Sequence, residues 1–355
     1  MRASLLGGVM TVAVVLLACA PPPPSGPVSG GVSAQPVAKK RLVAAVFSDP
    51  PGMYIHLTQP NVGSAPGVPE LWQILSAGMA YLDDDDQLHA VLAQDVPTAE
   101  NGLWEVLPGG TMRITWKLRP NLAWDDGVAL TADDFVFSYA FHSDKDVGIV
   151  IPAAIKLIDR VEAPDPATVV SYWKTTFIEA DRLFTFGLAP PIPRHVLEKS
   201  FLADKSSVLN EPYWREGFIG VGAYRLQAWE VGNHLMASAN EGYALGRPRI
   251  DELEVKFLAT DLNAILANLL AGSIQTLLGR GFTLDQGLQI RDMTKDVNVQ
   301  LGGKLGSTLP IFTQFVNTQP PIVLNVDFRR ALLMSIDREE MNDTLNYGLG
   351  QVSHT

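Results

Sequence analysis

The chain has 355 residues, with 27 Lys or Arg and 38 Asp or Glu, so its formal net charge at pH 7 is −11. Phosphate backbones repel a protein of this charge, which excludes nucleic acid as an expected partner. Apolar residues make up 47% of the chain, and there is one cysteine. A hydrophobic core and not an intrachain disulfide must therefore hold the fold, and the length favours about two domains.

The first 18 residues have the pattern of a secretory leader. Arg2 supplies a positive charge, and residues 5–17 supply an apolar stretch that is too short to span a membrane. Ala18 and Cys19 then resemble the end of a bacterial lipobox, in which the cysteine is acylated and becomes the new N-terminus. We expect residues 1–18 to be a signal peptide and Cys19 to carry a lipid. The alternative is an ordinary secretory leader with an incidental cysteine.

Residues 19–38 are rich in Pro, Gly and Ser and show neither a helical nor a strand period. Such sequences are extended and semi-rigid, so we expect a tether between the lipid and a globular body that begins near Lys39. The protein is accordingly expected outside the cytoplasm, in the periplasm or on the outer face of the cell membrane. Its contact with the membrane would be the lipid on Cys19.

The globular part is predicted to be mixed α/β, without a fixed-period repeat. Apolar and polar residues alternate over 112–118, which predicts a half-buried strand, and apolar residues recur at helical spacing over 262–270. The same criteria predict strands at 41–47, 112–118, 168–173, 224–229, 235–239, 251–258 and 311–316. They predict helices at 70–82, from 131, at 194–199, from 260 to 272, at 325–336 and from 337 to 348.

A turn and a helix start are predicted between the strand at 112–118 and the next one. Residues 124–127 (WDDG) favour a tight turn, because glycine tolerates positive φ. Thr131 is a good helix N-cap, and Asp133 and Asp134 suit the positive end of a helix.

No arrangement of catalytic or metal-binding residues stands out in the sequence. The chain lacks a nucleophile elbow, a phosphate loop and a complete dinucleotide fingerprint. The acidic pairs 125–126 and 133–134 and the acidic run 83–86 favour structural or solvated roles over acid–base chemistry or calcium binding. No metal-ligand spacing joins any two of the histidines, which are His56, His89, His142, His195, His234 and His354. We expect no catalytic residue, no metal and no cofactor, and a binding protein in preference to an enzyme.

Four segments together resemble the peptide-type (family 5) extracellular solute-binding proteins of ABC importers. They are 114–127 (ITWKLRPNLAWDDG) with 130–138 (LTADDFVFS), 220–226 (GVGAYRL), 240–251 with 270–275 (LAGSIQ), and 326–332 (VDFRRAL) with 336–338 (IDR). Their order and approximate spacing agree with the family. This chain departs from the family pattern at Val221, at Ala223 and at Gln275, which stands where the family often has Asp.

The resemblance implies a two-lobe periplasmic-binding-protein-like fold that closes over a solute. One lobe would comprise residues 39–82 and 190–260, with residues 83–189 inserted as a subdomain. The second lobe would begin at 261. In the family that lobe continues well past the segment matched here by 336–338, so the resemblance implies a second lobe that is incomplete at Thr355 and a truncated chain.

The resemblance also implies the function of an importer's binding component. The expected solute is an oligopeptide or similar small molecule, delivered by a monomeric protein to an ABC permease in the membrane. The layout places the following candidate ligand contacts at the cleft: Asp49, Pro51, Tyr54, Gly148, Ile149, Phe312 and Gln314. The alternatives are a surface lipoprotein acting as a sensor, adhesin or chaperone, a secreted hydrolase, and a fragment that binds nothing.

Overall fold

The structure is a computed structural model, and it describes residues 39–53, 67–83, 85, 87–258, 262–279, 283–293, 321–350 and 352. These residues form helices and strands in mixed order, which confirms the mixed α/β class. The expected strand at 311–316 lies outside the described residues, as do Cys19, Tyr54, Phe312 and Gln314.

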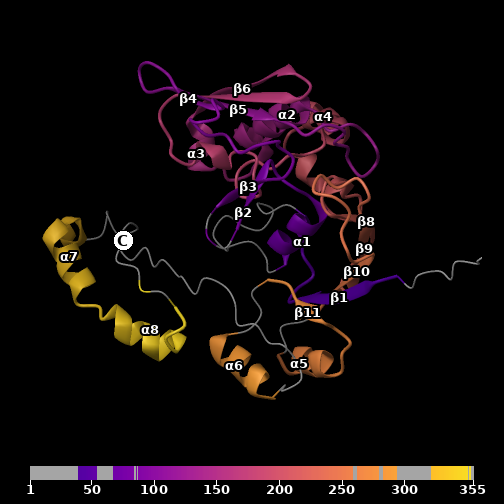
Figure 1. The fold of residues 1–355 in the computed structure, drawn as a ribbon, viewed down its shortest axis with the longest axis vertical. Helices are drawn as coiled ribbons and strands as arrows, with labels where there is room; N and C mark the ends of the chain where they lie inside the picture. Colours follow the sequence, from indigo (N-terminus) through magenta and orange to yellow (C-terminus); the bar gives the residue numbers. More distant parts are fainter. Residues whose placement is uncertain are drawn as a thin grey trace, which may run out of the picture. The chain divides into compact units, whose positions relative to one another are not determined.

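A five-stranded sheet is built from segments that are far apart in the sequence (Figure 1). Strand β1 pairs in parallel with both β10 and β11, and β9 and β8 continue the sheet in antiparallel order. The strand order is β11 (Thr276–Leu277), β1 (Arg41–Val46), β10 (Glu252–Phe257), β9 (His234–Ala239) and β8 (Tyr224–Glu230). The β8–β9 hairpin and the strands β1 and β10 confirm four of the predicted strands.

A four-stranded antiparallel sheet is formed by a continuous stretch of the chain. Its order is β4 (Trp104–Val106), β5 (Met112–Lys117), β7 (Thr168–Trp173) and β6 (Ile158–Asp165). Met112, Ile114 and Trp116 of β5 are buried while the residues between them are partly exposed, as the alternation predicts. A two-stranded ribbon of β2 (Ala80–Leu82) and β3 (Leu88–Ala90) precedes this sheet.

Helix α2 (Ala132–Ser143) contributes to two hydrophobic clusters. Phe135 packs in the cluster of the four-stranded sheet, with Trp116 and Trp173. Phe141 packs in the cluster of the five-stranded sheet, with Leu75 and Val255. Both phenylalanines are fully buried, and each such side chain contributes on the order of 2–3 kcal/mol to folding. One helix therefore ties the packing of the two sheets together.

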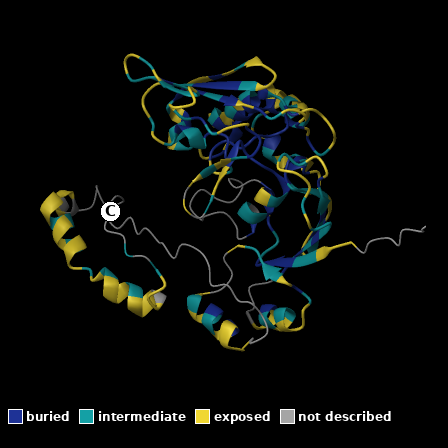
Figure 2. Cartoon of the chain, viewed as in Figure 1, coloured by how far each residue is buried: buried dark blue, intermediate teal, exposed yellow. Residues whose placement is uncertain are grey.

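The remaining helices are short, and the last two are largely exposed (Figure 2). No residue of α7 is buried. Within the described residues, no helix has the length and apolar character needed to cross a membrane. The α-helices besides α2 are α1 (Val68–Leu75), α3 (Ala153–Lys156), α4 (Arg194–Ala203), α5 (Leu262–Leu270), α6 (Leu284–Met293), α7 (Val326–Met334) and α8 (Arg338–Asn346). Short 3-10 turns occur at Lys145–Val147, Ala180–Arg182, Val208–Asn210, Pro212–Trp214 and Pro321–Leu324.

The helix predicted over 70–82 is wrong in its second half. Helix α1 ends at Leu75, and residues 80–82 form β2 instead. The backbone N–H of Met79 donates to the carbonyl of Phe184 at 2.9 Å, and a Cβ at Gly78 would lie 2.5 Å from that same carbonyl oxygen. This tertiary contact holds the segment extended, and it overrides the helical spacing of the apolar residues.

Candidate binding site

Three strands of the five-stranded sheet end at the same edge, because β1 runs parallel to β10 and β11. Leu258 directly follows β10, and its N–H donates to the carbonyl of Val46 at 2.9 Å. Leu278 directly follows β11, and its N–H donates to the carbonyl of Ala45 at 2.9 Å. We call this the carboxyl edge. Ligands of open α/β sheets bind in the crevice outside the carboxyl ends of the strands, so this edge is the candidate site.

Asp49 lies in the loop that follows β1 at the carboxyl edge. Its Oδ2 accepts a hydrogen bond from the N–H of Gly232 at 2.8 Å, and its Oδ1 accepts one from Nε1 of Trp229 at 3.4 Å. The guanidinium of Arg215 also lies 3.4 Å from Oδ2. The carboxylate therefore fixes the loop against the β8–β9 turn.

The other described candidates have different surroundings. Ile149 is 9% exposed and belongs to the same hydrophobic cluster as Met53. Pro51 and Gly148 are exposed, and Gly148 has a φ of +82° after a 3-10 turn. Within the described residues, no hydrogen bond or ion pair joins Asp49 or Pro51 to Gly148 or Ile149. Ligand contact by these four residues stays a prediction.

The predicted WDDG turn is joined to the segment 220–222 by reciprocal hydrogen bonds. The N–H of Asp125 donates to the carbonyl of Gly220 at 2.9 Å, and the N–H of Gly220 donates to Oδ2 of Asp125 at 3.1 Å. Nε of Arg225 lies 3.3 Å from Oδ1 of Asp125. We call this arrangement the Asp125–Gly220 junction.

Burial of the Asp125 side chain raises the pKa of its carboxyl from 3.8 to about 7, although the Gly220 N–H and Arg225 both act to lower it. The neighbouring Asp126 turns to a different partner, with its Oδ2 2.7 Å from Nε2 of His195. The two acids thus serve separate contacts and do not form a paired acid and base. This arrangement agrees with the structural role predicted for them.

The glycines of this segment allow a close approach between two backbones. A Cβ at Gly220 would lie 1.7 Å from the carbonyl oxygen of Leu75, and one at Gly222 would lie 2.4 Å from its carbonyl carbon. The N–H of Gly222 donates to that Leu75 oxygen at 3.1 Å. Only glycine permits this contact between the end of α1 and the start of β8.

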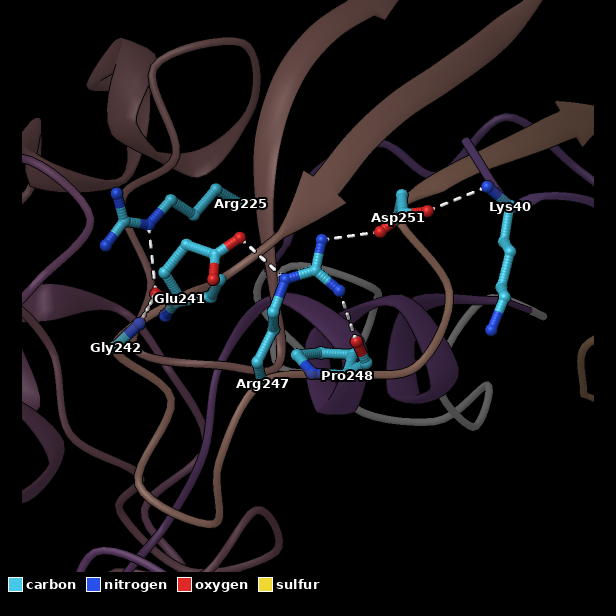
Figure 3. A network of polar contacts seen from close by, with 8 residues as sticks. Lys40, Arg225, Glu241, Gly242, Arg247, Pro248 and Asp251 are labelled. Carbon is cyan, nitrogen blue, oxygen red and sulfur yellow. Dashed lines mark hydrogen bonds and ion pairs between the residues drawn. The ribbon is translucent and has the colours of Figure 1, made fainter. Parts of the chain in front are cut away.

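A network of polar contacts lies at the opposite edge of the same sheet, where β1 and β10 begin (Figure 3). Arg247 bonds Oε1 of Glu241 through Nε at 2.6 Å and the carbonyl of Pro248 through Nη1 at 2.9 Å, and its guanidinium also pairs with Asp251. Oδ2 of Asp251 accepts from the N–H of Lys40 at 2.7 Å. Because Lys40 precedes β1 and Asp251 precedes β10, the network fixes the entry of both strands.

Gln275 has a structural contact of its own. Its Oε1 accepts from the N–H of Val43 at 2.7 Å, and its Nε2 donates to the carbonyl of Gly272 at 2.9 Å. These bonds hold the entry of β11 against β1. The segments that carry the family resemblance therefore serve largely as scaffold in this structure.

Comparison with known proteins decides the family. The model of the family described as "Bacterial extracellular solute-binding proteins, family 5 Middle" matches residues 98–355. The chain belongs to this family. The oligopeptide-binding protein AppA of Bacillus subtilis is 25% identical over 249 residues, which cover 69% of this chain and 43% of AppA.

Solved structures of family 5 proteins share the fold. The oligopeptide-binding protein of Thermus thermophilus, in complex with a pentapeptide, has a TM-score of 0.63 at 19% identity, covering 89% of this chain and 58% of that one. NikZ of Campylobacter jejuni, in complex with Ni(L-His), has a TM-score of 0.61 at 20% identity, with coverages of 90% and 58%. These matches concern binding proteins and not enzymes. The chain spans about half the length of the relatives that it matches.

Family 5 proteins are extracellular binding proteins, and this confirms the broad class predicted from the sequence, a solute-binding protein.

The sequence did not single out one residue that lies at the carboxyl edge. Glu70 lies in the first turn of α1, where an acid is ordinarily explained by the helix dipole, so no sequence signal distinguishes it.

Proposed function

We propose that this family 5 protein is the extracytoplasmic solute-binding component of an ABC importer and that its solutes are oligopeptides. The match of the family model across residues 98–355 carries this proposal. The similarity to AppA supports the peptide class. Peptide recognition would combine hydrogen bonds to the peptide main chain with roomy side-chain pockets at the carboxyl edge.

The proposed mechanism is closure of two lobes. Residues 39–82 and 190–260 would form the first lobe, residues 83–189 its inserted subdomain, and residues from 261 onward would belong to the second lobe. The pairing of β11 with β1 supports a connection between the segment after 261 and the first lobe at this edge. A solute that contacts both lobes favours the closed state by its differential affinity for that state.

The protein would work as a monomer held near its permease by a lipid on Cys19. The tether at 19–38 would give the binding body its reach above the membrane. The carboxyl edge would then face solutes outside the cytoplasm.

The experiment is a thermal-unfolding screen of the full chain against pools of peptides two to nine residues long, with Ni(L-His) as a non-peptide comparison. A ligand at 100 times its dissociation constant stabilises the folded state by about 2.7 kcal/mol. We expect at least one peptide pool to raise the melting temperature. A cooperative transition that no pool shifts would rule out the peptide proposal, and a shift by Ni(L-His) alone would replace it with a metal-chelate solute.

A further inference from the structure

Within the described part of the chain, one carboxylate oxygen at the carboxyl edge has no bonding partner. Glu70 is only partly exposed, and its Oε2 is buried with no hydrogen-bond partner. Among the described residues, no ion pair or hydrogen bond reaches either of its oxygens. Other buried acids have partners of opposite charge or N–H donors. Asp134 accepts hydrogen bonds from the N–H groups of Thr131 and Arg194. Oδ1 of Asp125 also has no hydrogen-bond partner, but it lies 3.3 Å from Nε of Arg225. A charged oxygen without a donor is costly, so Glu70 calls for an explanation.

The surrounding backbone holds the Glu70 side chain in place. A Cβ at Gly279 would lie 2.9 Å from both Cδ and Oε1 of Glu70, so the carboxylate sits directly against this glycine. Gly279 has a φ of +78° and comes two residues after β11. At the other side, a Cβ at Gly67 would lie 2.9 Å from Cβ of Val46, the last residue of β1. The residue before α1 thus packs on the end of β1, while the Glu70 carboxylate packs on the segment that follows β11.

The helix dipole alone does not account for this arrangement. An acid that only stabilises a helix start can remain in solvent, as Glu339 does in the first turn of α8. Glu70 instead has one oxygen removed from solvent and is packed against a strand end that lies 209 positions later in the sequence. A carboxylate held this way is prepared to accept hydrogen bonds from a cation.

We propose that Glu70 binds a cationic group of the solute, a primary ammonium or a guanidinium, at the carboxyl edge. This inference rests on the proposed solute-binding function. The cation could be the amino terminus of a peptide or a Lys or Arg side chain, because both present N–H donors and positive charge. The carboxylate oxygens would receive these donors, and the charge of the carboxylate would be neutralised in the complex.

The test compares the full chain with its Glu70→Gln variant, which keeps the shape of the side chain and removes its charge. Glu339→Gln is the matched control, since Glu339 is also a first-turn glutamate. The probes are pentaalanine with a free amino terminus, N-acetyl-pentaalanine amide, and N-acetyl-Ala-Ala-Lys-Ala-Ala amide. Binding is measured by calorimetry, and the fold of each variant by thermal unfolding.

We expect Glu70→Gln to weaken binding of at least one cationic probe by about 10- to 100-fold and to leave the neutral probe unchanged. The probe that is affected identifies the source of the cation. Glu339→Gln should change none of these affinities. Equal affinities of Glu70→Gln and the native protein for both cationic probes would overturn the inference, and so would an equal loss for the neutral probe.

A second measurement separates this inference from the proposed function. If the native protein binds none of the peptides, the peptide proposal fails, and the same comparison is made with L-lysinamide as a small cationic probe. A rise in melting temperature that Glu70→Gln abolishes would support the cation site on its own. The absence of a rise in the native protein, or an equal rise in both, would overturn it. A melting temperature of unliganded Glu70→Gln below the native value would assign Glu70 a structural role and contradict the inference.

Discussion

Replacing Asp125 with Asn should change how the stability of the protein depends on pH. Asp125 joins the WDDG turn to the start of β8, its side chain is 11% exposed, and burial raises the pKa of its carboxyl from 3.8 to about 7. Below pH 3.8 the carboxyl is protonated in both the folded and the unfolded chain. Between 3.8 and 7 the unfolded chain ionises first, so the free energy of unfolding falls as the pH rises. The loss is complete above about pH 7.

The size of this effect follows from the difference between the two pKa values. A separation of about three pH units corresponds to a loss of up to about 4 kcal/mol at about 1.4 kcal/mol per unit. Asn keeps an oxygen that can accept from the Gly220 N–H, and it has no charge to bury. The variant should therefore match the native protein near pH 4 and exceed its free energy of unfolding by up to about 4 kcal/mol at pH 8.

The assay is urea unfolding followed by tryptophan fluorescence at intervals from pH 4 to pH 8. Asp126→Asn serves as the control, because its carboxylate pairs with His195 and not with Gly220. The control should not show the stabilisation that grows toward pH 8. A stability difference for Asp125→Asn that stays flat from pH 4 to pH 8, or an Asn variant that is less stable at pH 8, would contradict a destabilising buried charge at Asp125.

Three further predictions concern the backbone contact, the loop after β1 and the lipid. Gly220→Ala should lower the free energy of unfolding by about 3 kcal/mol, the upper end of the usual cost of overpacking, because its Cβ would meet the Leu75 carbonyl oxygen at 1.7 Å. Gly187→Ala is the control, because a Cβ there has no atom within 4 Å. Equal stability of the two variants in urea would contradict the close contact. Asp49→Ala should lower the free energy of unfolding by about 1–3 kcal/mol, because it leaves the Gly232 N–H and Trp229 Nε1 without their acceptor. An unchanged urea midpoint would show that these bonds do not stabilise the loop. Labelled palmitate should be incorporated into the native protein and not into Cys19→Ser, and equal labelling of the two would exclude Cys19 as the lipidation site.

The sequence predicted elements well where periodicity and caps agree. The alternation of β5 and the strands β8 and β9 appear as expected, and Asn325 caps α7 by accepting from the N–H groups of Asp327 and Phe328. Strand β11 has only two residues, so no period could reveal it. The segment after α1 is held extended by the hydrogen bond from Met79 to Phe184, which is distant in the sequence. Local spacing could not reveal this contact, so it predicted a helix that continues past Leu75.

The candidate site was less predictable, because its contacts join distant segments. The sequence correctly placed Asp49 after the first strand. It could not show that the carboxylate of Asp49 would accept a hydrogen bond from the N–H of Gly232, which is distant in the sequence. It predicted a structural role for Asp125 without indicating the buried junction that raises its pKa. Glu70 has the sequence signature of an ordinary helix start, and only the close approach of Gly279 distinguishes it.

We propose that the protein captures oligopeptides outside the cytoplasm. The most direct measurement is native mass spectrometry of the full chain purified from bacterial membranes, followed by denaturation and identification of any released solute. We predict an added mass that resolves into peptides and that is exchanged when a defined peptide is supplied in excess. Release of a non-peptide solute alone, with no exchange for any peptide, would contradict the claim.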